Sequence, residues 1–266
     1  MTLPLIRESA VFMSPSVSVS VSELLVSMSV SELLVIVRVS VSELLVSVNE
    51  GRAEIRLLFA AAGVKYEDCR LEKEEFQQLK ASGKLPFNQL PILEVDDKIL
   101  AQSSTIIRYL GREIGFAPTN SFDIAKADMI GDALTDILEK AYKWYIEKDE
   151  ELKKKMTKEF YEETLPSALN LLEKIVKSSS GKYFVTDKLT YADINFFASM
   201  DLLFSDTKDI PPILDNFPCL KELYKEVRYN PGVDEWMGND HDVKFSFFCK
   251  ENLVASSKIY FDYPLN

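Results

Sequence analysis

The sequence predicts an α/β domain followed by an all-helical domain, and three observations support this prediction. Between residues 49 and 116, short apolar runs typical of strands alternate with segments whose apolar residues recur every three or four positions. From residue 117 to residue 238, nearly every segment has the helical recurrence. A turn-rich run at residues 117–123 lies where the two regions meet and is typical of a linker.

The composition is that of a soluble globular protein, because 47% of the 266 residues are hydrophobic and 27% are charged. A net charge of −11 argues against a nucleic-acid-binding protein, which would carry a basic patch. We find neither a run of about 18 apolar residues nor a signal peptide, so we expect a cytoplasmic protein that does not enter the membrane. Three cysteines, Cys69, Cys219 and Cys249, are too widely spaced for a disulfide framework or a metal cluster. The single histidine, His241, lies in a polar run near the C-terminus, so histidine-based catalysis is not expected.

Residues 1–48 differ in composition from the rest of the chain. The pentamer Ser-Glu-Leu-Leu-Val begins at Ser22, Ser31 and Ser42, within alternating valine and serine. These spacings are too short and too irregular for a solenoid, whose repeats span about 20 to 50 residues. The alternation favours strands with valine on one face, although a long exposed array of such strands would pair with itself. We interpret this Val/Ser repeat as an extension without a dedicated function, either ordinary low-complexity sequence or an expansion introduced by DNA slippage or faulty gene prediction.

The first domain is expected to open with a helix and a strand. Ile55, Leu58 and Phe59 fall on one helical face, and Gly63 is a good helix terminator. A short strand is expected at residues 66–70, and residues 91–95 and 99–101 should pair as a hairpin around a tight turn. The next helix should start at residues 102–104, with four buried positions: Ile106, Ile107, Leu110 and Ile114.

The second domain is expected to be helical throughout. Its helices are predicted from an apolar stripe, a Lys/Glu-rich segment that runs through Met156, and a segment from Leu165 to Val176. The stripe consists of Ile130, Leu134, Ile137 and Leu138. Thr190 and Asp193 have the spacing of a capping box, which predicts the start of a further helix. Residues 239–266 have no regular pattern and are left unassigned.

Four motifs in this order resemble the cytosolic glutathione transferases. They are Gly-Arg-Ala-Glu at 51–54, Leu-Pro-Phe-Asn-Gln-Leu-Pro-Ile-Leu-Glu-Val at 85–95, Gln-Ser at 102–103 and Leu-Thr-Tyr-Ala-Asp at 189–193. Each motif alone is weak, but the four together are specific. The sequence is most similar to the sigma class, which includes the haematopoietic-type prostaglandin D synthases. The resemblance runs from about Asn49 to Met237, and it implies a thioredoxin-like domain at 49–116, a helical domain at 117–238 and a homodimer.

The resemblance also implies where glutathione, the co-substrate, is held. Gln102 and Ser103 would hold the γ-glutamyl end. They open a helix, whose free N–H groups and positive dipole end attract a carboxylate. We expect Ser103 or Ser104 to cap that helix as well. Pro91 matches the family's cis-proline, which would turn the backbone of Leu90 toward the cysteinyl part of the ligand. A trans proline at the start of a strand is the alternative.

Further residues are assigned by the same resemblance. Phe76 and Lys80 would lie at the glycyl end of glutathione, although Lys80 alone would be an ordinary solvated lysine. Gln89 stands where many sigma-class members have lysine, so weaker binding of the carboxylate is expected. Asp136 matches an aspartate that reaches the glutathione of the partner subunit. Arg52 matches an arginine that polarises the surroundings of the thiol. The alternatives for these two residues are a surface carboxylate and a salt bridge.

The residue that stabilises the thiolate departs from the family pattern. Family members use a tyrosine at the end of the first strand, because a free thiol has a pKa near 8.5 and needs help to ionise at neutral pH. The Val/Ser repeat occupies this place, and aligning Asn49 with the family's asparagine puts Ser47 at the tyrosine position. Other transferase classes use serine for this task. The alternative is that Ser47 is simply one more serine of the repeat.

The function predicted from these residues is a glutathione transferase that conjugates glutathione to small apolar electrophiles, as in detoxification. Two alternatives remain open: a glutathione-dependent prostaglandin isomerase, and a glutathione-binding or structural member without turnover, as among the lens crystallins. No metal, nucleic acid or membrane is expected as a partner. Leu138, Tyr142 and Trp144 could face the apolar substrate, but aromatic residues at helical spacing more often belong to the core.

Overall fold

The computed structural model describes residues 35–40, 51–71, 73–95, 98–179, 182–204 and 210–239. Ser47, most of the Val/Ser repeat, Cys249, His241 and the tail from residue 240 lie outside the described residues. The chain divides into two compact units, Met1–Glu32 and Leu33–Asn266. Every described residue belongs to the second unit, and the fold below is the fold of that unit.

A four-stranded sheet forms the first layer of the fold. Its strands are β1 (Val35–Ser40), β2 (Glu67–Leu71), β3 (Ile92–Val95) and β4 (Lys98–Ala101), in the order β2-β1-β3-β4. β1 runs parallel to β2 and antiparallel to β3, and β3 and β4 form a hairpin. A parallel pair needs a crossover, and helix α2 (Gly51–Ala62) provides it. The strand predicted at 66–70 and the predicted hairpin are therefore confirmed.

The central strand β1 consists of residues from the Val/Ser repeat. Val37 pairs with Asp68 on β2 and with Leu93 on β3, so β1 is bonded on both sides. The last residue of β1 is Ser40, and ten residues separate it from the start of α2 at Gly51. Part of the repeat is thus the strand around which the sheet is ordered.

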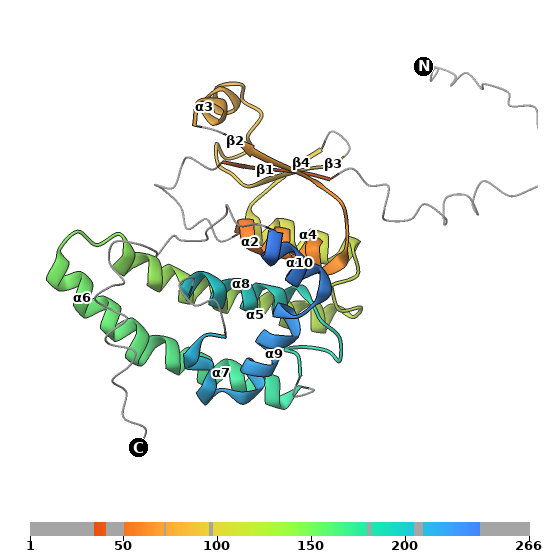
Figure 1. Ribbon diagram of the computed structural model, residues 1–266. Helices are drawn as coiled ribbons and strands as arrows, with labels where there is room; N and C mark the ends of the chain where they lie inside the picture. Colours follow the sequence, from red (N-terminus) through yellow and green to blue (C-terminus); the bar gives the residue numbers. More distant parts are fainter. Residues whose placement is uncertain are drawn as a thin grey trace, which may run out of the picture. The chain divides into compact units, whose positions relative to one another are not determined.

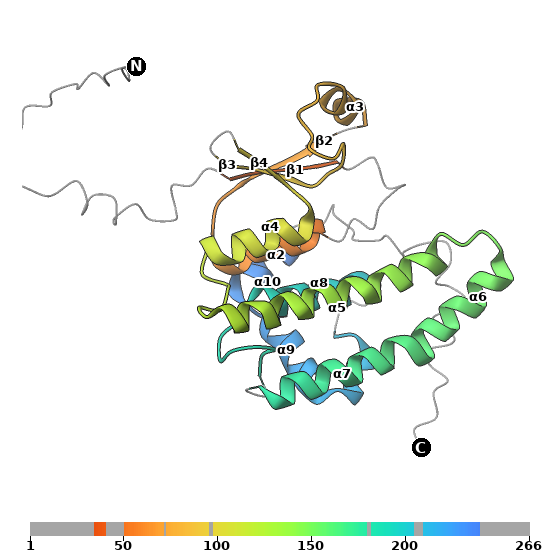
Figure 2. The ribbon, with the colours of Figure 1, turned by 180° about the vertical axis from the view of Figure 1, so that it is seen from behind.

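Helices cover both faces of the sheet (Figure 1). Ile92 packs into a small core under helix α3 (Lys73–Ala81), whereas Leu93 belongs to the main core together with α2 and helix α4 (Ser103–Glu113). Seen from behind, α2 and α4 lie between the sheet and the helical region (Figure 2). The sequence did not predict α3, because this short helix has only two large apolar residues.

Most predictions for α2 and α4 are confirmed. Ile55, Leu58 and Phe59 are fully buried, and Gly63 ends α2 with a φ of 63°, a conformation that glycine adopts without steric cost. Ile106, Ile107 and Leu110 are buried in α4 as expected. Ile114 was also predicted to be buried, and it packs against the main core but is only partly buried. It is the residue at which the chain leaves the helix, with φ −108° and ψ 13°, and its side chain is partly exposed.

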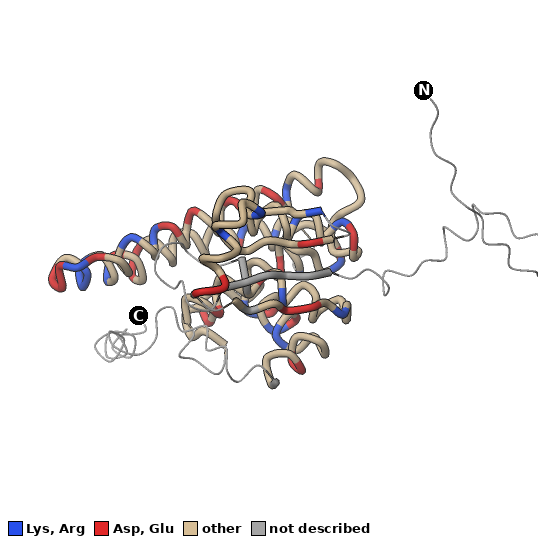
Figure 3. Tube along the Cα trace, turned by 90° about the horizontal axis from the view of Figure 1, so that it is seen from above, with Lys and Arg blue, Asp and Glu red and all other residues tan. Residues whose placement is uncertain are grey.

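The second layer is helical. Its elements are α5 (Ser121–Tyr145), α6 (Glu150–Glu159), the π-helical turn η2 (Phe160–Thr164), α7 (Leu165–Ser178), α8 (Tyr191–Leu203), the 3-10 turn η3 (Pro212–Asn216), α9 (Pro218–Arg228) and α10 (Pro231–Asn239). Ile130, Leu134, Ile137 and Leu138 are buried along α5, which confirms the predicted stripe. The predicted Lys/Glu-rich helix corresponds to α6, which has no buried residue. Figure 3 shows its acidic and basic residues interspersed along the arm that projects at the left.

Helix α8 lies at the centre of the helical layer, and nearly all of its residues are buried. The predicted capping box is present: the Asp193 carboxylate accepts from the Thr190 N–H and from its hydroxyl, both at 2.7 Å. The same carboxylate accepts from the Phe184 N–H at 2.9 Å. Burial raises the pKa of Asp193 to about 6, although these hydrogen bonds act to lower it.

The two layers share one main hydrophobic core, and two glycines allow close contact between them. A Cβ added at Gly111 of α4 would lie 2.4 Å from the ring of Tyr191 on α8. A Cβ at Gly232 of α10 would lie 1.9 Å from the carbonyl oxygen of Ala60 on α2. The last described helix therefore packs against the first. Within the described ranges, we find no helix long and apolar enough to cross a bilayer.

Candidate functional site

The strand register brings two of the predicted ligand-binding residues, Pro91 and Gln102, together at one edge of the sheet. Ile92 of β3 pairs with Ala101 of β4 and with Arg38 of β1. Continuing this register by one residue places Pro91 beside Gln102, and the C-terminal end of β1 follows on the other side. Three strand ends thus meet at this edge, which we call the site edge, and the chain enters α4 there.

The Leu90–Pro91 peptide bond at the site edge is cis, as predicted. Leu90 and Pro91 are both buried, and Leu90 packs in the small core beneath α3. The loop before this bond is more open: Gln89 is exposed, and Asn88 has a φ of 54°. The side chain of Gln89 is therefore accessible to a ligand, whereas Leu90 can offer only its backbone.

Gln102 has a left-handed backbone, with φ 74° and ψ 116°, immediately before α4. Such a conformation is unfavourable for a residue with a side chain and often marks a functional position. The Gln102 carbonyl accepts the first helical bond, from the Ile106 N–H at 2.9 Å. The N–H groups of the first helical residues have no acceptor within the helix, and together with the helix dipole they attract an anion.

The predicted capping of α4 by Ser103 or Ser104 is wrong. Gln102 is the N-cap residue, and no side chain makes a capping hydrogen bond. Ser103 is already the first helical residue, where its hydroxyl cannot replace an N-cap oxygen. The first-turn N–H groups of α4 therefore remain without a side-chain cap at the site edge.

Phe76 and Lys80 lie one turn apart on α3. The Phe76 ring is buried in the small core, and the Lys80 ammonium lies 5.7 Å from the centre of this ring. The rest of the Lys80 side chain is exposed. Of the two residues, only Lys80 can bind a carboxylate, whereas the buried Phe76 ring packs beneath the Lys80 ammonium.

For three predicted site residues, the described side chains give no position at the site edge. Ser47 lies outside the described residues, seven positions beyond the end of β1. Arg52 lies in the first turn of α2, but its side chain is not among those described. Asp136 lies on α5 and is exposed to solvent.

Two buried charged groups near the start of α2 were missed by sequence reasoning. Arg56 forms a two-pronged ion pair with Asp68 of β2, at 2.7 and 3.0 Å, and its side chain is only 3% exposed. Burial raises the pKa of the Glu54 carboxyl to about 7. A sequence signal existed for both residues, because each is charged and has an apolar residue on either side of it in the helix.

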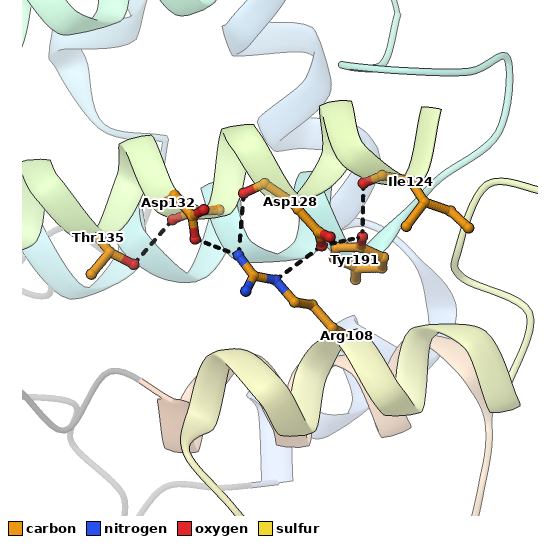
Figure 4. A network of polar contacts seen from close by, with 7 residues as sticks. Arg108, Ile124, Asp128, Asp132, Thr135 and Tyr191 are labelled. Carbon is orange, nitrogen blue, oxygen red and sulfur yellow. Dashed lines mark hydrogen bonds and ion pairs between the residues drawn. The ribbon is translucent and has the colours of Figure 1, made fainter. Parts of the chain in front are cut away.

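A polar network that joins α4, α5 and α8 was also missed (Figure 4). Arg108 of α4 forms ion pairs with Asp128 and Asp132 of α5. The hydroxyl of Tyr191 on α8 donates to Asp128 at 2.7 Å. Arg108 of α4, Asp128 and Asp132 of α5 and Tyr191 of α8 make up this network, and because they come from three separate helices, no local sequence pattern could have revealed it.

Comparisons with known proteins show the family to which this chain belongs. Residues 43–112 match the sequence profile of the glutathione S-transferase N-terminal domain, and residues 135–240 match that of the C-terminal domain. Glutathione S-transferase 1 of Ascaris suum is 38% identical over 185 residues, which cover 68% of this chain and 87% of that protein. This chain belongs to the glutathione S-transferase family. The co-substrate of the family is glutathione.

Two further relatives indicate how varied this part of the family is. S-crystallin 4 of Enteroctopus dofleini is 34% identical over 202 residues, covering 71% of this transferase and 92% of the crystallin. Hematopoietic prostaglandin D synthase of Gallus gallus is 36% identical over 188 residues, covering 70% of this chain and 90% of the synthase. Among solved structures, monomeric Na-GST-3 of Necator americanus superposes with a TM-score of 0.66 at 29% identity, covering 78% of this chain and 97% of that one.

Two further observations concern β1 and the residues considered for the apolar substrate. The match begins at residue 43, whereas β1 lies upstream of it at residues 35–40. Two of the residues considered for the apolar substrate, Leu138 and Trp144, are buried in the main core, and Trp144 packs against Phe160. Tyr142 is only partly buried.

Proposed function

We propose that this transferase binds glutathione at the site edge and conjugates its thiolate to small apolar electrophiles. The observation that carries the proposal is that Gln102, with its positive φ, lies beside Pro91 at the entry to α4, whose first turn has no side-chain cap. The first-turn N–H groups and Ser103 would bind the γ-glutamyl carboxylate, and the Leu90 backbone would pair with the cysteinyl residue. Lys80 and Gln89 would bind the glycyl carboxylate.

The proposed reaction forms a bond between the glutathione sulfur and an electrophilic carbon. The thiol first loses its proton to solvent, and any leaving group departs with the electrons of its bond to carbon. We assign Ser47 as the hydroxyl donor to the thiolate, because it stands at the position of the family's tyrosine when Asn49 is aligned with the family's asparagine. We assign Arg52 as the nearby positive charge. A hydrogen bond to the anionic form lowers the pKa of the thiol, which makes more thiolate available at neutral pH.

Two alternative functions are supported by specific relatives. The 36% identity to a hematopoietic prostaglandin D synthase supports isomerisation of a prostaglandin at the same site. The 34% identity to an S-crystallin, together with serine in place of the expected tyrosine, supports a glutathione-binding protein without turnover.

We also propose a homodimer in the cytoplasm, where the glutathione pool keeps thiols reduced. Met129, Asp132 and Asp136 are all exposed and lie on one face of α5, because they are three and four residues apart. Phe87, in the loop before the cis bond, has 60% of its surface exposed. An exposed aromatic residue is typical of a contact surface, and from this face Asp136 would reach the glutathione of the partner subunit.

Isothermal calorimetry on the purified full chain tests glutathione binding, and a chromogenic aryl halide tests conjugation. Ser103→Ala is expected to weaken binding about tenfold, since it removes a polar contact to a carboxylate. Ser178→Ala, an exposed serine near the end of α7, is the matched control and should bind as the wild type does. A wild-type chain that takes up no glutathione would refute the proposal.

Turnover separates the enzyme from the binder. Ser47→Ala is expected to abolish most conjugation while leaving glutathione affinity within about threefold. Ser40→Ala, at the end of β1, is the companion variant. If Ser40→Ala rather than Ser47→Ala removes the activity, the assignment of the hydroxyl donor is wrong. Binding by the wild type with no conjugation of any aryl halide would favour the crystallin-like alternative.

A further inference from the structure

The position of α4 decides the geometry of the proposed γ-glutamyl site, because Ser103 is its first residue. Gly111 lies eight residues further along the same helix, a distance of about 12 Å at 1.5 Å per residue. A tilt of about 5° at Gly111 would displace the first-turn N–H groups by about 1 Å. A shift of this size is enough to misalign a bound ligand. The contacts that hold the far half of α4 therefore matter for the site.

Tyr191, the first residue of α8, contacts this half of α4 with its side chain and the segment that follows α4 with its backbone. Its ring lies so close to Gly111 that an added Cβ would be 2.4 Å from the ring carbon Cδ1. Its backbone N–H donates to the carbonyl of Phe116, just beyond the end of α4, at 2.9 Å. Tyr191 thus sets the spacing between α4 and α8 and the path of the chain where it leaves α4.

The hydroxyl of Tyr191 closes a cycle of contacts through α5 (Figure 4). It donates to the Asp128 carboxylate at 2.7 Å. The same carboxylate oxygen lies 2.9 Å from Nε of Arg108, which belongs to α4. Arg108 is further held by Asp132 and, at 3.4 Å, by the backbone carbonyl of Asp128. The path from α4 through α8 and α5 back to α4 leaves little freedom for α4 to tilt.

The hydroxyl of Tyr191 stays protonated at neutral pH and therefore remains a hydrogen-bond donor. Burial, followed by the neighbouring Asp128 carboxylate, raises the pKa of the Tyr191 hydroxyl, whereas Arg108 and Arg112 act in the opposite direction. The Asp128 carboxylate binds both Arg108 and Tyr191. Replacing either this carboxylate or the Tyr191 hydroxyl therefore breaks the cycle of contacts.

We propose that Tyr191 is a positioning residue for glutathione: through Gly111, Phe116 and the Asp128–Arg108 pair it sets the orientation of α4 and hence of Ser103. The inference rests on the proposed function. Tyr191 does not touch the ligand, so its loss should weaken glutathione binding without changing the rate at saturating glutathione. This expectation differs from that for a purely structural tyrosine, whose loss would lower stability and leave the affinity unchanged.

The test compares three variants by calorimetry with glutathione, by thermal unfolding and by steady-state kinetics. Tyr191→Phe keeps the ring but removes the hydroxyl, and it should raise the Kd and KM for glutathione about threefold to tenfold with kcat within about twofold. Asp128→Asn keeps an acceptor for the tyrosine and weakens the pair with Arg108, and it should raise the Kd about threefold. Tyr224→Phe is the matched control: this tyrosine is equally buried, and it packs on Phe197 of α8 from α9.

The outcomes separate this inference from the proposed function. The inference is supported if Tyr191→Phe and Asp128→Asn weaken binding whereas Tyr224→Phe does not. It is overturned if Tyr191→Phe lowers the Tm but binds glutathione like the wild type. If Tyr191→Phe does not fold, Asp128→Asn decides alone, and an unchanged Kd overturns the inference. A wild-type chain that does not bind glutathione removes the proposed function itself, and this inference with it.

Discussion

Strand β1 and helix α8 occupy equivalent places, each at the centre of its layer, yet their sequences specify them in different ways. β1 lies between β2 and β3, and α8 contacts α2, α4, α5 and α9. β1 comes from a repeat in which similar residues recur every second position, so a slip by two residues offers much the same pattern. α8 depends on single residues, such as Asp193 at its start and Tyr191 against Gly111. The helical layer is thus specified by individual residues, and the sheet centre mainly by a pattern.

The largest effect should come from Asp193→Ala at the start of α8. It leaves the buried N–H groups of Thr190 and Phe184 without their acceptor, which we expect to cost about 4 kcal/mol of unfolding free energy. Urea unfolding followed by circular dichroism measures this loss. Asp187→Ala, an exposed aspartate in the preceding loop, is the control. A cost below about 1 kcal/mol would mean that α8 does not depend on its capping box.

Gly111→Ala probes the same helix from the side of α4. The new methyl group meets the Tyr191 ring at 2.4 Å, so one of the two helices must move, at a cost of about 2 to 3 kcal/mol. Gly238→Ala on α10 is the control, because nothing lies within 4 Å of the added carbon there. Denaturant midpoints of the two variants give the comparison. Equal midpoints would contradict a close α4–α8 contact.

Proline substitutions in α8 and in β1 test whether the two elements are specified differently. Ala198→Pro removes a helical hydrogen bond in the middle of α8 and should cost about 3 kcal/mol or more. Val37→Pro removes a ladder bond in β1, but the repeat offers neighbouring residues of the same alternation, so we expect a cost about 2 kcal/mol smaller. Urea unfolding of both variants tests the difference. If Val37→Pro is as costly as Ala198→Pro, then β1 has a uniquely specified register.

The smallest expected effect concerns Glu54, whose pKa is about 7 in the fold against 4.5 in the unfolded chain. The folded state therefore binds more protons between these values, and stability falls as the pH rises from 4.5 toward 7. Glu54→Gln should remove this dependence and gain about 1 to 2 kcal/mol at pH 7.5, with no gain at pH 4.5. Unfolding curves at the two pH values provide the measurement. A variant less stable than the wild type at pH 7.5 would indicate that the charged carboxylate is stabilised.

The sequence predicted the features of the fold that depend on local patterns. The apolar stripe of α5, the capping box of Thr190 and Asp193, and the glycine that ends α2 each follow from residues close together in the chain. The cis Leu90–Pro91 bond was also predicted, but from the family resemblance and not from local chemistry.

The errors and omissions arise where distant segments decide the outcome. Ile114 has the helical spacing of a buried residue, but the chain leaves α4 just before it. Ser103 is a residue type that caps helices, yet the strained Gln102 takes the capping position. The network of Arg108, Asp128 and Tyr191 requires three helices to meet, and this meeting cannot be read from any one of them. The assigned roles of Ser47, Arg52 and the other glutathione-binding residues stay predictions.

The contact of α10 with α2 has a consequence for how the protein is made. The carbonyl of Ala60 is covered by Gly232, a residue synthesised about 170 positions later. On the ribosome, the face of α2 that receives α10 must therefore remain uncovered until almost the whole described chain has emerged. We therefore expect the packing around α2 to be completed only after α10 has been synthesised.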